Sequence, residues 1–386
     1  MKSKTNISCG IITMHRVINY GSVLQALALQ ETLCLLGGNA LIIDYVYPES
    51  NSASISETVI RKVKEFCALI LARIGIRTNC SNNYFKRKSF ELFRKRYLKT
   101  TKKEYSRDDL ALLKDLDFDV FITGSDQVWN PKHMLQHTAF LLSFVKNNSH
   151  KVAFSASSAT VLFQPSEIKI LTKYLSQYRS ISVREQHTAK RLEEISGKKV
   201  FTTCDPTLLL DEKQWQNYID NNALKPYDNY IFVYILSYEI NPYPYLFDLI
   251  SEIKNKYNLP IIAMGDVDAL KSYFGIKCIT YASPSDFLNI IRNANLVITS
   301  SYHGTIFSLI FKRPFISLIQ KNISTDSRAY SLLNRIGAQK HLVEVGDKVE
   351  VENLMKNVDY SAAIASFRQE SLNYISEHIL FNIDNL

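Results

Sequence analysis

The chain has 386 residues, 46% of them hydrophobic and 22% charged, which predicts folded globular domains and excludes an intrinsically disordered chain. Its net charge of +9 is unevenly distributed: residues 61–103 hold 14 Lys and Arg against two acidic residues, and the other 343 residues carry a net charge of −3. No apolar run reaches the about 20 residues that a membrane-spanning helix needs, and the first residues do not resemble a signal peptide. We therefore expect about two domains in a cytoplasmic protein whose six scattered cysteines are reduced thiols.

Short apolar runs alternate with helical patterns along the first half of the chain. The pattern predicts a strand over residues 7–13, a helix over 22–36 that Gly37 and Gly38 end, and a strand over 40–45. Further strands are predicted over residues 120–123, 152–155, 180–183 and 200–204. Strands separated by helices in this way favour a parallel sheet.

A second series of the same kind follows a polar stretch over residues 220–229, which is typical of a linker. It has predicted strands over 230–235, 260–264, 296–299 and 315–318, with helices over 243–257, 284–293 and 303–312. A final amphipathic helix over 362–379 is expected to pack back on the first domain.

The predicted fold class is therefore α/β, with two doubly wound Rossmann-like domains that face a cleft. We assign residues 1–219 to the first domain, on the acceptor side, residues 226–361 to the second, on the donor side, and residues 362–386 to the returning helix. In such folds ligands bind at the carboxyl ends of the strands, in the cleft. The loops at these ends are therefore where functional residues are expected.

The turn after the first strand places Asn19, Tyr20, Gly21 and Ser22 at a helix N-terminus, where free backbone N–H groups favour an anion. The alternative is an N-cap with a tight turn and no ligand. The pattern is not G-x-G-x-x-G, so it does not indicate a dinucleotide cofactor.

Polar and aromatic residues follow the strand over 120–123, after a turn at Gly124. A Trp beside amide groups is typical of a sugar-binding wall, in which the ring stacks on the sugar and the amides bond its hydroxyls. An Asx-type turn with a packing Trp is the alternative. The residues concerned are Ser125, Asp126, Gln127, Trp129 and Asn130.

Two further strand ends bear charged or titratable residues. Arg184 follows the strand over 180–183 and suits a carboxylate or phosphate, although a salt bridge to Glu185 is the commoner fate of such a residue. His303 lies between Ser301 and Gly304 in the first turn of a predicted helix, where a functional histidine is favoured.

Two D-x-D patterns, at residues 115–119 and 266–268, are also found in the metal sites of sugar-nucleotide enzymes. The first runs into a strand and is more simply interpreted as a helix end. We predict neither a metal nor a cofactor for this protein.

Five pieces of sequence, in this order, resemble the polysaccharide pyruvyl transferase family. They are residues 19–30 (NYGSVLQALALQ), 124–131 (GSDQVWNP), 182–185 (SVRE), 205–210 (DPTLLL) and 299–304 (TSSYHG). The resemblance covers residues 7–345 and implies a fold like the GT-B glycosyltransferases. It also implies transfer of pyruvate from phosphoenolpyruvate to two hydroxyls of a sugar in a cell-surface polysaccharide, such as a capsule or exopolysaccharide, or in its lipid-linked precursor, with formation of a ketal and release of phosphate.

The resemblance associates Arg184 and His303 with the donor. It shows one departure, because some members have Arg and others Asp where this chain has Ser301, and we interpret Arg328 as the replacement cation. The predicted catalytic residues are His303 and Asp126. The predicted donor-binding residues are Arg184, Ser300, Ser301, Tyr302, His303, Gly304 and Arg328, and the predicted acceptor-binding residues are Asn19, Tyr20, Gly21, Gln25, Ser125, Asp126, Gln127, Trp129 and Asn130.

Two other functions fit the same fold: a GT-B glycosyltransferase that uses a nucleotide-sugar, and a non-catalytic relative that binds glycan. The basic segment 61–103 also has two interpretations, because apolar residues alternate with its charges. It forms either solvated amphipathic helices or a peripheral contact with an anionic membrane at the inner face of the plasma membrane, where a lipid-diphosphate-linked sugar would be met. No nucleic-acid-binding motif accompanies it, so nucleic acid is not expected as a partner.

Overall fold

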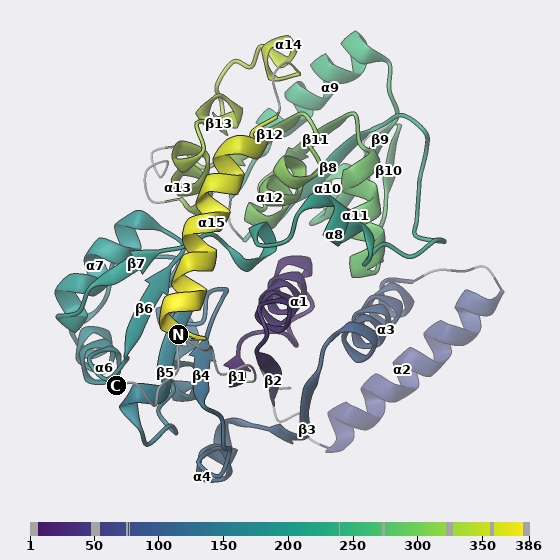
Figure 1. The fold of residues 1–386 in the computed structure, drawn as a ribbon. Coiled ribbons are helices and arrows are strands. Elements are labelled where there is room, and N and C mark those ends of the chain that lie inside the picture. Colours follow the sequence, from purple (N-terminus) through teal and green to yellow (C-terminus); the bar gives the residue numbers. More distant parts are fainter. Residues whose placement is uncertain are drawn as a thin grey trace.

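The computed structural model describes residues 7–47, 55–74, 76, 78–238, 240–271, 275–321, 327–355 and 359–380. Two parallel sheets, each flanked by helices, lie one above the other in Figure 1. The predicted class of two doubly wound α/β units is therefore confirmed.

The first sheet has strand order β3-β2-β1-β4-β5-β6-β7, with every pair parallel. Its order reverses between β1 and β4, as in a Rossmann fold. The strands are β1 (Ser8–Ile12), β2 (Asn39–Tyr45), β3 (Thr100–Tyr105), β4 (Val120–Thr123), β5 (Lys151–Ala156), β6 (Ser180–Val183) and β7 (Val200–Thr202).

The second sheet repeats this topology with order β10-β9-β8-β11-β12-β13, and it reverses between β8 and β11. Its strands are β8 (Ile231–Ile235), β9 (Ile261–Gly265), β10 (Ile276–Cys278), β11 (Leu296–Thr299), β12 (Phe315–Ile319) and β13 (Leu342–Glu344). The central strands β8, β11 and β12 are buried along their whole length, as expected for strands covered by helices on both faces.

The longer helices cover both sheets and connect their strands. They are α1 (Tyr20–Leu35), α2 (Ile55–Arg73), α3 (Asn79–Tyr97), α6 (Pro165–Leu175), α7 (Gln186–Ser196), α9 (Tyr245–Tyr257), α11 (Pro284–Asn293), α12 (Tyr302–Ile310), α13 (Arg328–Arg335) and α15 (Ser361–His378). Short α-helical turns are α4 (Leu110–Leu113), α5 (Pro131–Met134), α8 (Glu212–Gln216), α10 (Asp268–Lys271) and α14 (Val351–Leu354).

The last helix, α15, returns to the first sheet, as its amphipathic pattern predicts. Tyr374 donates its hydroxyl to the carbonyl of Ala153 in β5 at 3.0 Å, and Ser371 accepts from the backbone N–H of Cys204 at 2.9 Å. Figure 1 shows this helix running from the second sheet down to the first. It therefore ties the two halves of the chain together.

Three strands were not predicted, namely β3, β10 and β13. All three lie at sheet edges, and β3 has the polar sequence TTKKEY. An edge strand has only one neighbour and one buried face, so its sequence lacks the apolar signal of a central strand.

Packing between the two halves is aromatic where α1 meets α11. The ring of Tyr20 stacks on that of Phe287 with centroids 4.4 Å apart, and its hydroxyl donates to the carbonyl of Ala282 at 3.1 Å. One cluster of buried apolar side chains runs through residues of both sheets at this point. The two halves therefore share a core.

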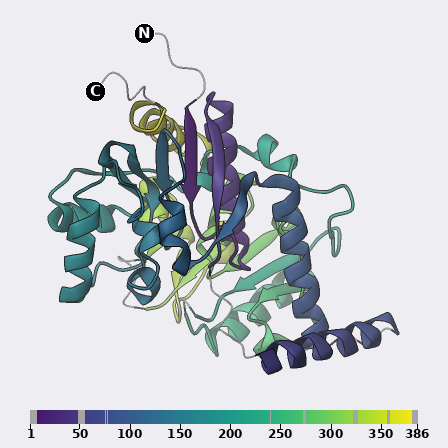
Figure 2. The ribbon, with the colours of Figure 1, turned by 90° about the horizontal axis from the view of Figure 1, so that it is seen from below.

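The basic segment forms the helices α2 and α3, which lie at the edge of the molecule in Figure 2. Helix α3 buries Phe90 and Phe93 against the body of the protein. Within the described residues, no helix is long and apolar enough to cross a membrane.

Candidate active site

The loops that follow the central strands of both sheets meet in the cleft. In the first sheet these loops follow β1 and β4, on either side of the point where the strand order reverses. In the second sheet they follow β8 and β11. This geometry brings the N-terminus of α1 close to the N-terminus of α12.

The contact between the two helix ends is made by Gly21 and His303. A Cβ atom added to Gly21 would lie 1.9 Å from Nδ1 of His303, so only glycine leaves room for the imidazole. Asn19 caps α1 by accepting from the N–H groups of Gly21 and Ser22, and Ser301 caps α12 by accepting from that of Gly304. The predicted turn at 19–22 is thus a helix cap and also a contact surface for the histidine.

The other side of the His303 ring faces Asp205, which lies in the loop after β7. Nε2 of His303 is 3.5 Å from Oδ2 of Asp205, and Thr207 donates its hydroxyl to Oδ1 of the same carboxylate at 2.6 Å. Burial favours the neutral acid, but the charges of His303 and Arg184 hold the pKa of Asp205 well below its usual range. The histidine therefore faces an ionised carboxylate, the arrangement that orients imidazole in general acid–base sites.

Arg184, which the sequence suggested would point into the cleft, lines a separate small cavity with Asp205 and Tyr302 and not the cavity that His303 and Asp126 line. Its side chain is fully buried, and NH1 donates to Asp205 at 2.7 Å, while Glu185 and Asp126 lie at 3.6 and 3.8 Å. Burial opposes the charged form, but these carboxylates raise the pKa of the guanidinium. Arg184 therefore compensates buried carboxylates, and Glu185 is one of its partners.

Tyr302 joins Arg184 to a second arginine. The guanidinium carbons of Arg184 and Arg328 lie 5.0 and 5.5 Å from the centre of its ring, within cation–π distance. The amide of Gln127 also reaches Arg328: with its oxygen turned toward the guanidinium it accepts from NH1 and NH2 at 3.1 and 3.2 Å.

The loop after β4 holds Asp126 in an unusual backbone conformation. Asp126 has φ +73°, Gly124 before it has φ +115°, and a Cβ at Gly124 would lie 2.2 Å from the carbonyl oxygen of Phe154. The Asp126 carboxylate accepts from the hydroxyl of Ser22 and, at 2.9 Å, from the N–H of Gln127. Burial opposes ionisation, but Arg184 and His303 lower its pKa, so this carboxylate is held in place as an anion.

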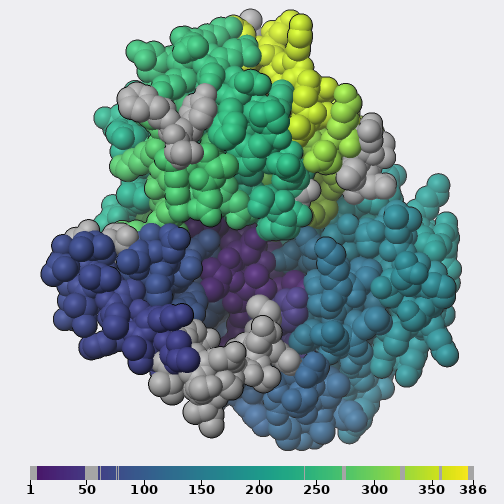
Figure 3. All heavy atoms as spheres, turned by 180° about the vertical axis from the view of Figure 1, so that it is seen from behind, coloured from purple at the N-terminus to yellow at the C-terminus, as the bar shows by residue number. Residues whose placement is uncertain are grey.

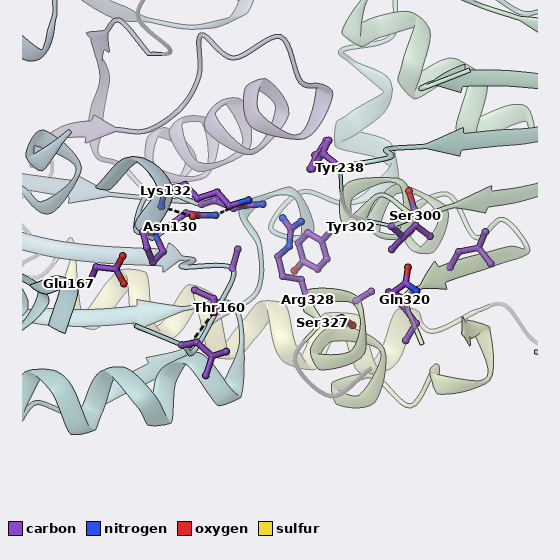
Figure 4. A pocket seen from close by; sticks show the side chains of 18 of the residues that line it. Asn130, Lys132, Thr160, Glu167, Tyr238, Ser300, Tyr302, Gln320, Ser327 and Arg328 are labelled. Atoms are coloured by element: carbon purple, nitrogen blue, oxygen red, sulfur yellow. Dashed lines mark hydrogen bonds between the residues drawn. The ribbon is translucent and has the colours of Figure 1, made fainter. Parts of the chain in front are cut away.

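Two adjoining cavities open between the sheets. The smaller has a volume of about 180 Å³ and is lined by Asn19, Ser22, Asp126 and His303, together with Tyr47 and His133. The larger has a volume of about 490 Å³, and Figure 4 shows Asn130, Lys132 and Glu167 from the first half facing Ser300, Gln320 and Ser327 from the second. Four side chains line both cavities: Gln127, Tyr238, Tyr302 and Arg328.

Several residues predicted to bind the acceptor lie elsewhere. Trp129 is fully buried, donates its indole N–H to the carbonyl of Phe140 at 3.1 Å and packs edge-on against Tyr178. It is therefore a core residue and not the wall of a sugar site, because no face of its ring is accessible.

Gln25 and Ser125 are corrected in the same way. The amide of Gln25 donates to the hydroxyl of Thr13 and accepts from the backbone N–H of Ser125, and both side chains are fully buried. They connect the loop after β1 to the loop after β4. Tyr20, a further predicted acceptor-binding residue, packs between the two halves of the chain as described above.

Some residues at the site were not singled out from the sequence, namely Tyr47, His133, Asp205 and Tyr238. Asp205 is the first residue of the DPTLLL piece, so the family resemblance could have pointed to it. His133 accompanies Gln127, whose carbonyl lies 2.8 Å from its Nε2, and burial lowers the pKa of this histidine. The ring of Tyr47 packs against that of His133 in a tilted arrangement, with centroids 5.3 Å apart. Tyr47 and His133 belong to no sequence motif. They reach the cavity from two different loops, so no local pattern marks them together.

The D-x-D aspartates serve backbone capping. Asp266 accepts from the N–H and hydroxyl of Ser237, and Asp119 accepts from the N–H and hydroxyl of Ser8. No cluster of three or more metal-binding side chains occurs in the part of the chain that the structure describes.

Comparisons with known proteins agree with this architecture. A family model described as polysaccharide pyruvyl transferase matches residues 19–322. The structure resembles UDP-GlcNAc 2-epimerase of Methanocaldococcus jannaschii in complex with UDP-GlcNAc and UDP, with a TM-score of 0.52 at 15% identity over 96% of this chain and 99% of that one. UDP-GlcNAc 2-epimerase from Neisseria meningitidis bound to UDP-GlcNAc gives 0.50 at 12% identity over 98% and 100%. These likenesses show a GT-B type fold, while a search of curated proteins found no match.

Proposed function

Because the chain belongs to the polysaccharide pyruvyl transferase family, we propose that it transfers the pyruvate unit of phosphoenolpyruvate to two hydroxyls of a sugar and releases phosphate. The chain is a transferase of this family; the donor, the ketal chemistry and the sugar carrier are the parts that we propose. The acceptor belongs to a cell-surface polysaccharide or to its lipid-diphosphate-linked precursor.

The observation that carries this proposal is the position of His303, Asp126 and Arg328 on one small cavity. Its volume of about 180 Å³ is smaller than the about 300 Å³ at which sites for drug-sized ligands begin. A small anionic donor fits within this cavity alone, whereas a nucleotide-sugar would also have to occupy the larger cavity beside it. A titratable imidazole, an anionic carboxylate and a guanidinium together provide proton exchange, hydroxyl orientation and anion binding.

The reaction requires two hydroxyl protons to be redistributed. The methylene carbon of phosphoenolpyruvate gains a proton and becomes the methyl group, while the adjacent carbon becomes electrophilic and forms a C–O bond to the first hydroxyl. Cleavage of its bond to the phosphate oxygen then allows the second hydroxyl to bond to the same carbon. One of the two hydroxyl protons balances the new methyl hydrogen and the other leaves on phosphate, so no oxidant is needed.

We assign proton exchange with a hydroxyl or the phosphate oxygen to His303, with Asp205 as the residue that orients its ring. Asp126 orients the acceptor hydroxyl, because its carboxylate is fixed by Ser22 and lies on the same cavity. The N–H groups of the first turn of α12, at Tyr302 and His303, add a favourable helix dipole for the donor's negative charge.

Arg328 takes the role of the cation that binds the donor. It lines both cavities, whereas Arg184 lines neither and is paired with Asp205. This agrees with the departure at Ser301, where some family members have an arginine. The larger cavity, with its amides and hydroxyls at Asn130, Ser300 and Gln320, suits the acceptor sugar.

The test is release of inorganic phosphate from phosphoenolpyruvate in the presence of a panel of sugar acceptors, free and lipid-linked. We expect release with at least one acceptor, and a loss of about 100-fold or more in rate for His303→Ala and for Asp126→Ala. Near wild-type rates in both variants would show that the catalytic assignment is wrong.

A thermal-shift titration separates the donor classes. Phosphoenolpyruvate should raise the unfolding temperature by mass action, whereas UDP-GlcNAc should not. The reverse result would favour a nucleotide-sugar glycosyltransferase.

A further inference from the structure

Helix α2 presents a continuous apolar face to solvent. Phe66 is 65% exposed and Ile74 is 69% exposed, values far above those of core residues. Among the side chains that the structure describes on this helix, Ile60, Val63, Ile70 and Leu71 are also exposed. Exposed apolar residues are common singly, but a contiguous group of large ones marks an interaction surface.

The spacing of these residues places them on one side of the helix. At about 100° per residue, positions 60, 63, 66, 70, 71 and 74 fall within an arc of about 140°. Glu65, Ala68, Leu69 and Ala72, on the opposite arc, are less exposed, and Ala68 is buried. Helix α2 therefore has apolar residues on its inward side and also on its outward side, whereas an ordinary surface helix presents polar residues to solvent.

The inward side of α2 is attached to the protein through α3. Glu65 pairs with Arg87 of α3, and the two helices lie against each other. In Figure 3 they form a lobe at the edge of the molecule, beside the second half of the chain. The outward apolar face is therefore held by the fold in a fixed direction.

Lysine and arginine residues border the apolar face. By the same helical projection, Lys64 lies on one side of the arc, and Lys62 and Arg73 lie on the other. All three are exposed, as are Lys88 and Lys95 on α3. Apolar side chains flanked by cations are the pattern of helices that lie in the interface of an anionic bilayer.

We propose that the α2 face, defined by Val63, Phe66, Ile70 and Ile74 with Lys62, Lys64 and Arg73 at its borders, binds the surface of an anionic membrane. The helix lies parallel to the bilayer, with its apolar side chains about 5–10 Å into the headgroup region. A second copy of the chain is a poor occupant, because it would bring two strongly basic segments together, whereas anionic lipid complements them. The face would hold the active site near a lipid-linked sugar.

Co-sedimentation of the full chain with lipid vesicles tests this surface without any substrate, so its outcome does not depend on the proposed reaction. We expect binding to phosphatidylcholine vesicles that contain about one-third phosphatidylglycerol, weakened by high salt, and little binding to phosphatidylcholine alone. Phe66→Ser/Ile70→Ser/Ile74→Ser should reduce binding about tenfold or more. Lys62→Glu/Lys64→Glu/Arg73→Glu should reduce vesicle binding by about fivefold for each basic residue replaced.

Control variants carry substitutions of the same kinds at exposed positions outside α2. Leu35→Ser/Leu112→Ser replaces exposed apolar residues outside α2, and Lys169→Glu/Lys190→Glu replaces exposed lysines on α6 and α7. Both should bind vesicles like the wild type, and circular dichroism checks that every variant is folded. The proposal would be overturned if wild-type binding did not depend on lipid charge or on salt. It would also be overturned if the apolar triple variant bound vesicles as well as the wild type does. A different result would assign the face to a second copy of the chain: the wild type forms a dimer in sedimentation equilibrium and does not bind vesicles, and the apolar triple variant is a monomer.

Discussion

Nε2 of His303 lies 3.5 Å from Oδ2 of Asp205, so that a histidine after β11 of the second sheet faces a carboxylate after β7 of the first. Each residue follows a strand end, and only the closure of the two halves brings them together. The pair gives the site an ionised carboxylate behind the imidazole. It also makes the histidine's orientation depend on the packing of the two halves.

Asp205→Asn tests this relationship. We expect kcat to fall about 100-fold or more while the KM for phosphoenolpyruvate changes little, because the amide cannot orient the imidazole or balance its charge. The loss of a partner for Arg184 should also lower the free energy of unfolding by about 3 kcal/mol. Steady-state kinetics and urea denaturation measure the two effects. The control Asp211→Ala removes another capping carboxylate, at α8, and should lower stability by about 1 kcal/mol with kcat unchanged.

Gly21→Ala should disturb His303 from the opposite side of its ring. The added methyl group overlaps the imidazole, so we expect a stability loss of about 1–3 kcal/mol and a reduced kcat. A double-mutant cycle with His303→Ala provides the check, because removing the ring removes the overlap. Additive effects on the free energy of unfolding would mean that the two residues do not contact each other.

Arg328→Lys keeps a positive charge but loses the planar fork of donors. We expect the KM for phosphoenolpyruvate to rise about tenfold with a smaller change in kcat. Arg191→Lys, at a surface pair with Glu194, is the matched control and should leave both constants unchanged. An unchanged KM in Arg328→Lys would remove Arg328 from the donor site.

Trp129→Phe distinguishes a core tryptophan from a sugar-stacking one. The carbonyl of Phe140 loses one of its two donors and keeps the hydroxyl of Thr123, and the smaller ring leaves a space in the core. The free energy of unfolding should therefore fall by about 1–3 kcal/mol. The KM for the acceptor should stay at the wild-type value, because the ring does not line either cavity. A raised KM at unchanged stability would restore the sugar-wall interpretation.

His341 predicts a pH dependence of stability far from the site. Burial lowers its pKa from 6.5 to about 4, and its ring nitrogens lie 2.9 Å from the carbonyl of Phe315 and 3.0 Å from the hydroxyl of Tyr360. In the unfolded chain His341 binds a proton below pH 6.5, whereas in the folded chain it binds one only below about pH 4. The neutral His341 therefore causes no loss of stability above pH 6.5, and the free energy of unfolding should fall by about 3 kcal/mol as the pH drops to 4. His341→Gln should flatten this decline in urea titrations, and an equal decline in both proteins would contradict the assignment.

The sequence by itself determined the fold class and the family. The central strands are short, apolar and separated by helical patterns, and such local signals survive without tertiary information. The motif residues at strand ends also point to the cleft, since the carboxyl ends of parallel strands meet at one edge. Helix 284–293 was predicted at its observed bounds because Ser283 and Pro284 give an N-cap and a first-turn proline.

Only the tertiary structure decided which motif residues reach the cleft. Sequence spacing places Trp129, Gln25 and Arg184 near the cleft, but burial and pairing depend on neighbours from distant segments. Trp129 packs on Tyr178, and Arg184 donates a hydrogen bond to Asp205. The outward face of α2 is a further example, because the sequence shows which residues share a side of the helix but not which side packs on the protein. Packing of the side that holds Ala68 and Leu69 against α3 settles that question and leaves Phe66, Ile70 and Ile74 exposed.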